Sequence, residues 1–239
     1  MHLDLRDEVL QANVELSRRG LAKHTFGNAS AIDRAAGHVV IKPSGVPYHA
    51  MTASDMVITD LDGKIVEGSL KPSSDLATHI ELYRAFKAIG GVVHTHSHYA
   101  TSWAQSLHDI PCLGTTHADY FRGPVPLTDP LSDEEIESDY EKNTGLAIVR
   151  CFDDIDPMEM PAVLVASHAS FVWGKTVSAA VETADILEEV ARMAYHALTL
   201  DPGAEQISDA LLDKHFLRKH GSKATYGQNL DRGPKTEVR

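Results

Sequence analysis

Apolar residues recur at helical spacing in several parts of the chain. In segment 3–19 they fall on one face, and Gly20 is a typical residue to end such a helix. A second helix is expected to begin at Pro72-Ser73-Ser74-Asp75, with Ser73 or Ser74 as the N-cap and Asp75 in the first turn. The same spacing predicts three more helices, near 100–106, 178–198 and 211–220, the last ended by Gly221.

Short apolar runs between turn residues predict strands. The expected strand pairs are Ala29–Asp33 with His38–Ile41 and Asp55–Thr59 with Lys64–Glu67, the second pair joined at Asp62-Gly63. The run before His94 and the run Ala162–Ala166 predict core strands, while Thr25–Ser30 is expected to be a loop of small residues.

The mixture of helices, strands and hairpins indicates an α/β fold. We expect an α/β/α layered single domain over residues 1–228, with a central, mainly antiparallel or mixed sheet. Residues 229–239 are polar and are expected to form a disordered tail. The chain has no G-x-G-x-x-G and no P-loop pattern, which argues against a dinucleotide or nucleoside-triphosphate site of those kinds.

Composition narrows the class of partner. The 239 residues carry a formal net charge of -12, which argues against general binding to nucleic acid or to an anionic membrane. Two cysteines form no disulfide framework, and no signal peptide or apolar run of membrane-spanning length is evident. These features favour the cytoplasm.

The 14 histidines are unusual, and two of them stand close together in Val92-Val93-His94-Thr95-His96. Side chains alternate between the two faces of a strand, so both imidazoles are expected to point the same way. Such a pair forms half of a site for a first-row metal. The alternative is a polar strand end with solvated histidines.

A catalytic metal commonly has three protein ligands and an open position. His168, at the end of an apolar strand, is the candidate third ligand, and Asp75 is the candidate acidic one. Each has an ordinary alternative, as a polar strand-end residue and as a helix N-terminal charge. His98 lies near a turn into a helix and is expected to be a bystander. Imidazole and carboxylate ligands suit zinc, manganese, iron or cobalt, and ligand type does not separate them.

Small polar residues in loops form a candidate phosphate pocket. Ser73 and Ser74 lie at an expected helix N-terminus, where free N–H groups favour an anion. Lys42 adds a charge. Each residue alone could serve only turn or capping chemistry. The full candidate set is Asn28, Lys42, Ser44, Gly45, Ser73 and Ser74.

Several of these motifs occur together in one family. The ordered set Gly27-Asn28-Ala29-Ser30, Lys42-Pro43-Ser44-Gly45, Lys71–Asp75, His94-Thr95-His96 and His168 resembles the class II aldolase family. Within that family, Gly114–Tyr120, the segment around Glu141 and the tail 212–228 resemble the L-ribulose-5-phosphate 4-epimerases. The similarity extends from about residue 5 to residue 228.

The resemblance implies a metal set and a reaction. Its metal residues are His94, His96 and His168, with Asp75 at the acidic position, and zinc is the expected ion, with manganese or cobalt as alternatives. It implies an isomerase of pentose and arabinose catabolism that cleaves and re-forms C3–C4 of L-ribulose 5-phosphate, yielding D-xylulose 5-phosphate. One departure is Ala169, where the family commonly has glycine after the last histidine, so a negative φ is required there.

The resemblance also implies catalytic and structural roles beyond the metal. Asp119 and Tyr226 are expected to move protons on the two sides of the C4 oxygen. A homotetramer is implied, with both groups reaching into a neighbouring subunit's site. Residues expected to orient the substrate or close the site are Thr115, Glu141, His215 and Arg218.

Three other functions remain possible from the sequence. The first is a class II phosphosugar aldolase that releases glycolaldehyde phosphate or a similar aldehyde. The second is a non-catalytic binding module of the same fold, which retention of all three histidines disfavours. The third is a structural zinc protein, which the lack of clustered cysteines disfavours.

Overall fold

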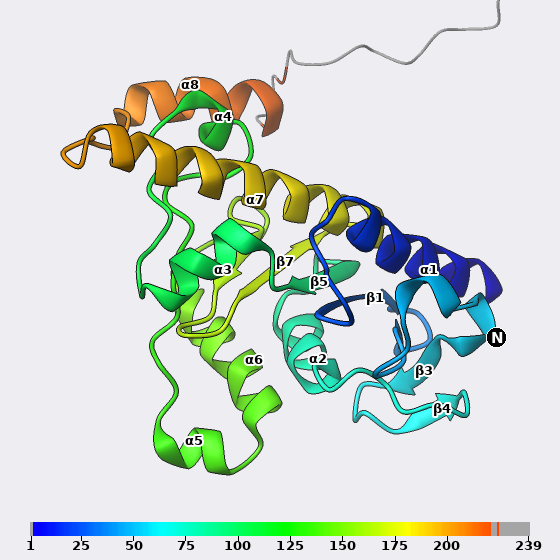
Figure 1. Ribbon diagram of the computed structural model, residues 1–239. Helices are drawn as coiled ribbons and strands as arrows, with labels where there is room; N and C mark the ends of the chain where they lie inside the picture. The colour runs from blue at the N-terminus through cyan, green and yellow to red at the C-terminus, as the bar shows by residue number, and fades with distance from the viewer. Residues whose placement is uncertain (1, 221–223, 225–239) are drawn as a thin grey trace, which may run out of the picture.

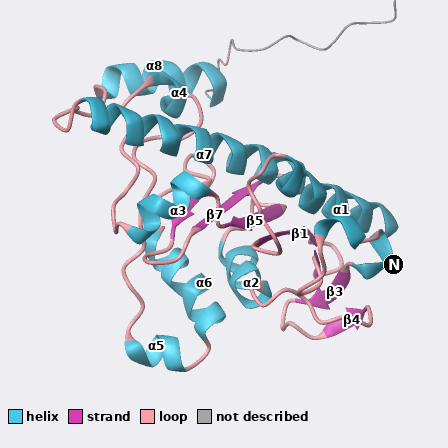
Figure 2. Ribbon diagram, viewed as in Figure 1, coloured by secondary structure: helices cyan, strands magenta, loops and turns pink. Residues whose placement is uncertain are grey.

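In the computed structural model, residues 2–220 and Ala224 are described. The described residues form a sheet between two layers of helices (Figure 1, Figure 2). The strands are β1 (Gly27–Asp33), β2 (His38–Ile41), β3 (Val57–Asp60), β4 (Ile65–Glu67), β5 (Gly91–Thr95), β6 (Ala162–Leu164) and β7 (Ser170–Gly174). The helices are α1 (Leu3–Arg18), α2 (Leu76–Ala85), α3 (His98–Gln105), α4 (Thr115–Ala118), α5 (Asp133–Glu137), α6 (Tyr140–Cys151), α7 (Val177–Leu200) and α8 (Asp209–His220), with 3-10 turns η1 (Tyr48–Ala50) and η2 (Ala53–Asp55).

The sheet confirms the expected fold class. Its strand order is β4-β3-β2-β1-β5-β7-β6, and each neighbouring pair of these strands is antiparallel. Helices α1, α3 and α7 pack together on one side of the sheet, and α2 and α6 pair on the other (Figure 1). Strand β5 is central, and His94 on it lies opposite Asn28 of β1 and Phe171 of β7.

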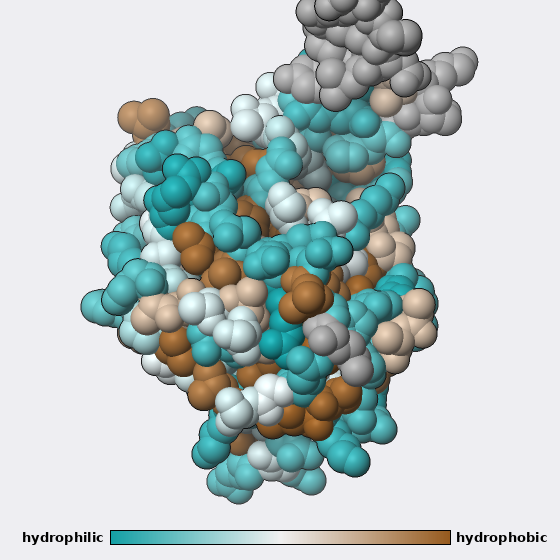
Figure 3. Space-filling model, turned by 90° about the vertical axis from the view of Figure 1, so that its right-hand side faces the viewer, coloured by the Kyte–Doolittle hydropathy of each residue, from teal (hydrophilic) through white to brown (hydrophobic). Residues whose placement is uncertain are grey.

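The core fills both sides of the central strands. Trp173, Tyr83 and Phe171 are among the largest fully buried side chains. The side on which Figure 1 places α1 and β4 faces the viewer in Figure 3, where apolar patches are interrupted by polar groups. Within the described part of the chain, no helix combines the length and apolar character needed to cross a bilayer.

Several element boundaries differ from the predictions. Strand β1 begins at Gly27, so Asn28 lies in the sheet rather than in a loop. Gly27 has a φ of 136°, and a Cβ there would lie 2.8 Å from the carbonyl oxygen of His94, so a residue without a side chain is needed at this close approach. Strand β6 ends at Leu164, earlier than expected.

The start of α2 was also predicted wrongly. The helix begins at Leu76, with Asp75 at the N-cap, and neither Ser73 nor Ser74 caps it. The Asp75 carboxylate makes no capping bond and instead accepts a hydrogen bond from Asn28. The hydrogen bond with Asn28 on β1 thus takes the place of a capping bond within α2. Helix α6 and strand β7 were not predicted.

The C-terminal predictions lie partly outside the described residues. Helix α8 is present and is described to His220, whereas its expected stop, Gly221, is not described. Residues 229–239 also lie outside the described part, and the domain limits 1–228 stay a prediction.

Candidate metal centre

His94 and His96 present their ring nitrogens to each other. The two Nε2 atoms lie 3.1 Å apart, although β5 ends at Thr95 and His96 is the first residue after it. Nδ1 of His94 donates to the carbonyl oxygen of Ser170 at 2.9 Å. Because a carbonyl can only accept, this bond keeps the proton on Nδ1 and leaves the Nε2 lone pair for a ligand.

His168 completes a triangle of imidazoles. Its ring centroid lies 5.0 Å from that of His94 and 5.0 Å from that of His96. One ligand atom from each of the three rings lies within 4.8 Å of the others. The turn between β6 and β7 holds His168 in place. Ser167 is the residue of this turn with left-handed backbone, with a φ of 59°. Ala169 is not among the described residues of positive φ, so the Cβ of Ala169 is compatible with the turn.

The charge state of the triangle suits a cation. Burial and the neighbouring imidazole of His94 lower the pKa of both His96 and His168 to about 4. Both rings are therefore neutral near pH 7, and a neutral imidazole is the form that binds a metal. The three donors fit a divalent first-row ion with a position left open.

Asp75 lies in the same pocket and is firmly held. Nδ2 of Asn28 donates to its Oδ2 at 2.6 Å, and the Ser73 hydroxyl lies 3.5 Å from that oxygen. Burial would raise the pKa of the Asp75 carboxyl, but His94, His79 and Asn28 hold it below its ordinary value. Asp75 is thus an ionised carboxylate facing the imidazoles, and its role as a ligand stays a prediction.

The residues predicted to bind phosphate border the cavity that contains the histidine triangle. Two Lys-Pro-Ser loops pair there, since the amide of Ser44 donates to Lys71 and the amide of Ser73 donates to Lys42. The cavity of about 390 Å³ is lined by the triangle, by Asp75, Tyr140 and Glu141, by Thr25, Phe26 and Gly27, and by the predicted residues Asn28, Lys42, Ser44, Gly45, Ser73 and Ser74. The fold therefore gathers all six predicted phosphate-pocket residues around one cavity.

Lys42 places a cation at the base of these loops. It is 2% exposed, and its Nζ donates to the carbonyl of Pro43 at 3.2 Å. Burial lowers the pKa of its ammonium group, and Asp75 partly offsets that effect. A buried ammonium group with one carbonyl bond is well suited to an arriving anion.

Tyr140 is a pocket residue that the sequence analysis missed. Its hydroxyl lies 3.4 Å from Nδ1 of His168, and burial raises the pKa of the phenol. The hydroxyl of Thr78 donates to the carbonyl of Glu141, which fixes the start of α6 against α2. The sequence Asp139-Tyr140-Glu141 carries no metal-ligand spacing, and the resemblance around Glu141 was the signal that could have pointed to its neighbour Tyr140.

Four predicted residues are not in the pocket lining. Thr115 is the first residue of α4, Asp119 follows that helix, and His215 and Arg218 are on α8. Figure 1 places α4 beside α8 near the C-terminal end of α7. A single chain therefore does not bring Asp119 to the histidine triangle. Tyr226 lies outside the described residues.

Asp119 is the centre of its own polar cluster. Arg218 donates to both of its carboxylate oxygens, at 3.0 and 2.7 Å, and Nδ1 of His215 lies 3.0 Å from Oδ1. Burial would raise the pKa of Asp119, but the bonds from Arg218 and His215 hold it below its ordinary value. The carboxylate thus joins α4 to α8 in ionised form.

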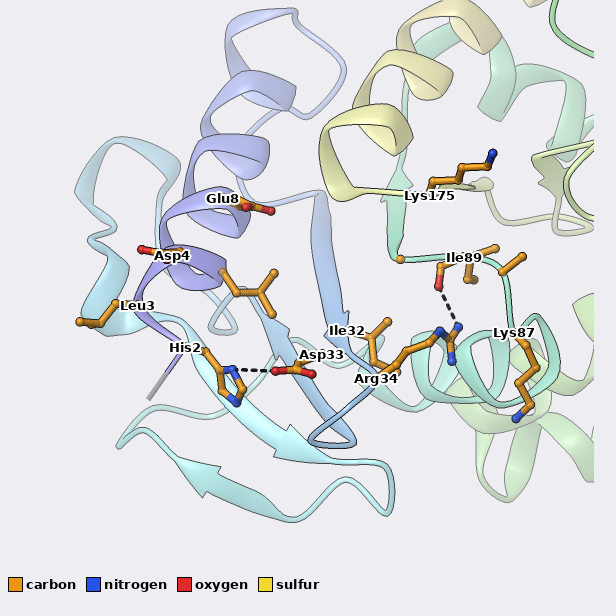
Figure 4. A pocket seen from close by; sticks show the side chains of 13 residues that line it. His2, Leu3, Asp4, Glu8, Ile32, Asp33, Arg34, Lys87, Ile89 and Lys175 are labelled. Atoms are coloured by element: carbon orange, nitrogen blue, oxygen red, sulfur yellow. Dashed lines mark hydrogen bonds and ion pairs between the residues drawn. The ribbon is translucent and has the colours of Figure 1, made fainter. Parts of the chain in front are cut away.

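A second cleft lies beside the N-terminus (Figure 4). Three of its polar side chains are engaged by the fold: His2 pairs with Asp33, and the Arg34 guanidinium donates to the carbonyl oxygens of Tyr83, Phe86 and Ile89. The histidine pocket is the better candidate for chemistry because its donors converge on one point.

Comparison with known proteins agrees with this fold. Residues 7–195 match the family described as "Class II Aldolase and Adducin N-terminal domain". The chain belongs to the class II aldolase family, as the motifs predicted.

Curated relatives are similar over nearly the whole length. The L-ribulose-5-phosphate 4-epimerase UlaF of Salmonella paratyphi A (strain ATCC 9150 / SARB42) is 53% identical over 224 residues, which cover 94% of this chain and 98% of that protein. The protein of that name from Salmonella typhi gives the same values.

Solved structures support the fold. An L-fuculose 1-phosphate aldolase matches with a TM-score of 0.76 at 24% identity, covering 89% of this chain and 94% of that one. The L-fuculose-1-phosphate aldolase of Thermus thermophilus matches with a TM-score of 0.67 at 24% identity, covering 85% of this chain and 98% of that one. At this identity the likeness shows a shared fold.

Proposed function

We propose that this protein is an L-ribulose-5-phosphate 4-epimerase. The observation that carries the proposal is the 53% identity to proteins of that name over 94% of the chain. Two further features support it. The histidine triangle and the adjacent carboxylate would hold a metal ion, and the cavity is lined by the residues predicted to bind phosphate.

The reaction explains why such a pocket is required. The hydrogen on C4 of L-ribulose 5-phosphate is not adjacent to the C2 carbonyl, so removing it leaves a carbanion without stabilisation. Breaking C3–C4 instead delivers the electron pair to an enediolate at C2 and C3. Rotation of the released aldehyde and renewed bond formation then invert C4. The enzyme must therefore stabilise charge and keep both fragments bound.

His94, His96 and His168 are the residues that would hold the metal ion, with Asp75 as the acidic ligand or a close neighbour. A bound divalent ion supplies Lewis acidity for the charge that develops on the C2 and C3 oxygens. Zinc is the proposed ion, with manganese or cobalt as alternatives.

The loops around Lys42 would retain the second fragment. Its ammonium group, the hydroxyls of Ser44, Ser73 and Ser74, and the backbone at Gly45 surround the space in which a phosphate would bind. Asn28 links this region to the metal region through its bonds to Ser73 and Asp75. An anchored phosphate keeps glycolaldehyde phosphate in place while its aldehyde turns.

Proton transfer at the C4 oxygen is assigned to Asp119 and Tyr226. Because Asp119 is outside the pocket of its own chain, we assign both groups to a neighbouring copy in a homotetramer. Thr115, His215 and Arg218 would reach the substrate from that copy, whereas Glu141 acts from within the chain that holds the histidines.

The test is turnover of L-ribulose 5-phosphate by the purified protein, before and after chelation, with metal analysis of the same sample. D-xylulose 5-phosphate should form, activity should fall on chelation, and added zinc, manganese or cobalt should restore it. Free glycolaldehyde phosphate at a rate matching ketose loss would identify an aldolase instead. Activity that survives complete metal removal would overturn the mechanism.

A further inference from the structure

An aromatic ring lies against the buried cation of the candidate phosphate pocket. Nζ of Lys42 lies over the ring of Tyr48, 5.2 Å from the ring centroid. Both residues are buried. Tyr48 is the first residue of η1 and follows Gly45 by three positions, so the same stretch of chain carries the candidate phosphate loop and the ring.

The ring contacts Lys42 from outside the cavity. Lys42 lines the cavity that contains the histidine triangle, whereas Tyr48 is not among its lining residues. One of the three ammonium hydrogens is directed to the carbonyl oxygen of Pro43, at 3.2 Å. The face of an aromatic ring attracts a cation through its quadrupole and does not need a particular hydrogen. The contact with Tyr48 therefore stabilises the ammonium group and leaves hydrogens for an anion in the cavity.

An uncharged partner suits an anion-binding lysine better than an acidic one. A carboxylate in contact with Nζ would neutralise the ammonium group and repel a phosphate at close range. The charge of Asp75 acts on Lys42, but the Asp75 carboxylate is bonded to Asn28. The ring of Tyr48 carries no net charge, so it attracts the cation without opposing the arrival of a phosphate.

The phenol of Tyr48 is anchored to β1. Its hydroxyl donates to the carbonyl oxygen of Gly27 at 2.7 Å, the usual length of an O–H···O bond. Burial raises the pKa of this phenol, so it keeps the hydrogen that it donates. Strand β2 ends opposite Ser30, so no residue of β2 pairs with Gly27. The bond from Tyr48 thus joins the phosphate loop to β1 at the residue before Asn28, and it fixes the position of the ring.

We propose that Tyr48 is a positioning residue for Lys42. Its ring holds the ammonium group at the wall of the cavity, where the phosphate of the substrate would meet it, and its bond to Gly27 holds the ring. Tyr48 acts through Lys42 and not by contact with the substrate. The proposal rests on the proposed function, because it takes this cavity to be the place where a sugar phosphate binds.

The first experiment detects the ring at the lysine side chain. Protein labelled with carbon-13 in lysine is studied by proton–carbon NMR, and the Lys42→Met spectrum identifies the Lys42 signals by subtraction. Protons above an aromatic ring are shifted upfield, so we expect the ε-methylene protons of Lys42 upfield of the ordinary lysine position. The shift should remain in Tyr48→Phe and disappear in Tyr48→Leu. An ordinary position in the wild type, or an unchanged shift in Tyr48→Leu, would overturn the proposal.

The second experiment compares the same two substitutions by their affinity for inorganic phosphate, measured by calorimetry on the metal-loaded full chain. Both variants lack the bond to Gly27, but only Tyr48→Leu lacks the ring. We expect Tyr48→Leu to bind phosphate about 10-fold more weakly than Tyr48→Phe. Equal phosphate affinities in the two variants, or a wild-type protein that binds no phosphate, would contradict the role of the ring.

Cobalt binding provides the control for a general disturbance of the site. Neither substitution changes the histidine triangle, so the cobalt affinities of Tyr48→Leu and Tyr48→Phe should agree within about twofold. A loss of cobalt affinity in Tyr48→Leu that matches its loss of phosphate affinity would show that the ring supports the fold and does not act on Lys42.

These measurements also separate this inference from the proposed function, because none of them uses the substrate. If L-ribulose 5-phosphate is not epimerised but phosphate affinity depends on the ring, the proposed function fails and the role of Tyr48 stands. If epimerisation is found and the two variants bind phosphate equally, only the role of Tyr48 fails.

Discussion

Nε2 of His94 faces Nε2 of His96 at 3.1 Å, while Nδ1 of His94 is committed to the carbonyl of Ser170. The backbone of β7 thus fixes the tautomer of a ring on β5. This arrangement would prepare His94 to bind a metal ion, because the bond to Ser170 already sets the orientation of the ring and leaves Nε2 as the free nitrogen.

Removing His94 should abolish metal binding while leaving the fold intact. We expect His94→Asn to lower the affinity for zinc by at least about 100-fold, since even residues that only orient ligands contribute 10–100-fold. The measurement is competition with a chelating indicator, with circular dichroism as the check on folding.

His98→Asn is the matched control for this prediction. His98 is exposed at the start of α3 and does not line the pocket. Its substitution should change zinc affinity by less than about twofold. Comparable losses in the two variants would show that the triangle is not the binding site.

Lys42 is expected to lower the free energy of unfolding of the unliganded protein and to contribute to phosphate binding. Its ammonium group is buried with one carbonyl partner, so Lys42→Met is expected to raise the free energy of unfolding by about 1–2 kcal/mol in the absence of ligand. The same variant should lose most of the rise in melting temperature that inorganic phosphate gives the wild type.

Lys71→Met serves as the control for Lys42→Met. Lys71 belongs to the paired loop but is exposed and does not line the cavity. It should keep the phosphate response and the wild-type stability. A phosphate response that persists in Lys42→Met would place the anion elsewhere.

Acid should destabilise the protein through its buried histidines, and His117 provides a test away from the metal centre. Burial lowers the pKa of His117 to about 4, and its Nε2 donates to the carbonyl of Gly123 at 2.8 Å. The unfolded chain takes up this proton near pH 6.5, so between about pH 6.5 and 4 it binds more protons than the folded one. Stability present above pH 6.5 is therefore lost as the pH falls, by up to about 3 kcal/mol for this group.

The measurement is the free energy of urea unfolding from pH 7 to pH 4. His117→Gln keeps a donor for Gly123 but cannot titrate. Its free energy of unfolding should therefore fall less steeply with pH than that of the wild type, by a slope that corresponds to the uptake of up to about one proton. Parallel curves for the two proteins would mean that His117 is not held neutral in the folded state.

The sequence predicted which histidines come together better than it predicted the elements that carry them. His94, His96 and His168 could be assigned from residue type and motif, and hairpin β3–β4 from Asp62-Gly63. Strand β7 was not predicted because it is buried on both faces, so its sequence shows no alternation of apolar and polar residues. Its pairing with β5, which sets the bond from His94 to Ser170, depends on contacts distant in sequence.

Local reasoning also failed at Asp75. Helix rules favoured a serine cap, but the bond from Asn28 to Asp75 crosses from β1 to α2 and fixes the start of the helix. Propensity describes one segment at a time, whereas this position is decided by a partner 47 residues away. The place of Tyr140 depends on the packing of α2 against α6 in the same way.

The separation of Asp119 from the histidine pocket leads to the last prediction. If each site takes its histidines from one chain and its proton-transfer groups from another, two inactive variants should complement each other. His94→Asn retains Asp119 and Tyr226, and Tyr226→Phe retains the metal centre. After unfolding and refolding together in equal amounts, mixed tetramers should recover up to about a quarter of wild-type activity, because random assortment pairs intact halves at about one interface in four. Each variant refolded alone should stay inactive, and a mixture of His94→Asn with His168→Asn, which damage the same half, should recover nothing. Activity equal to that of the separately refolded variants would indicate a site built within one chain.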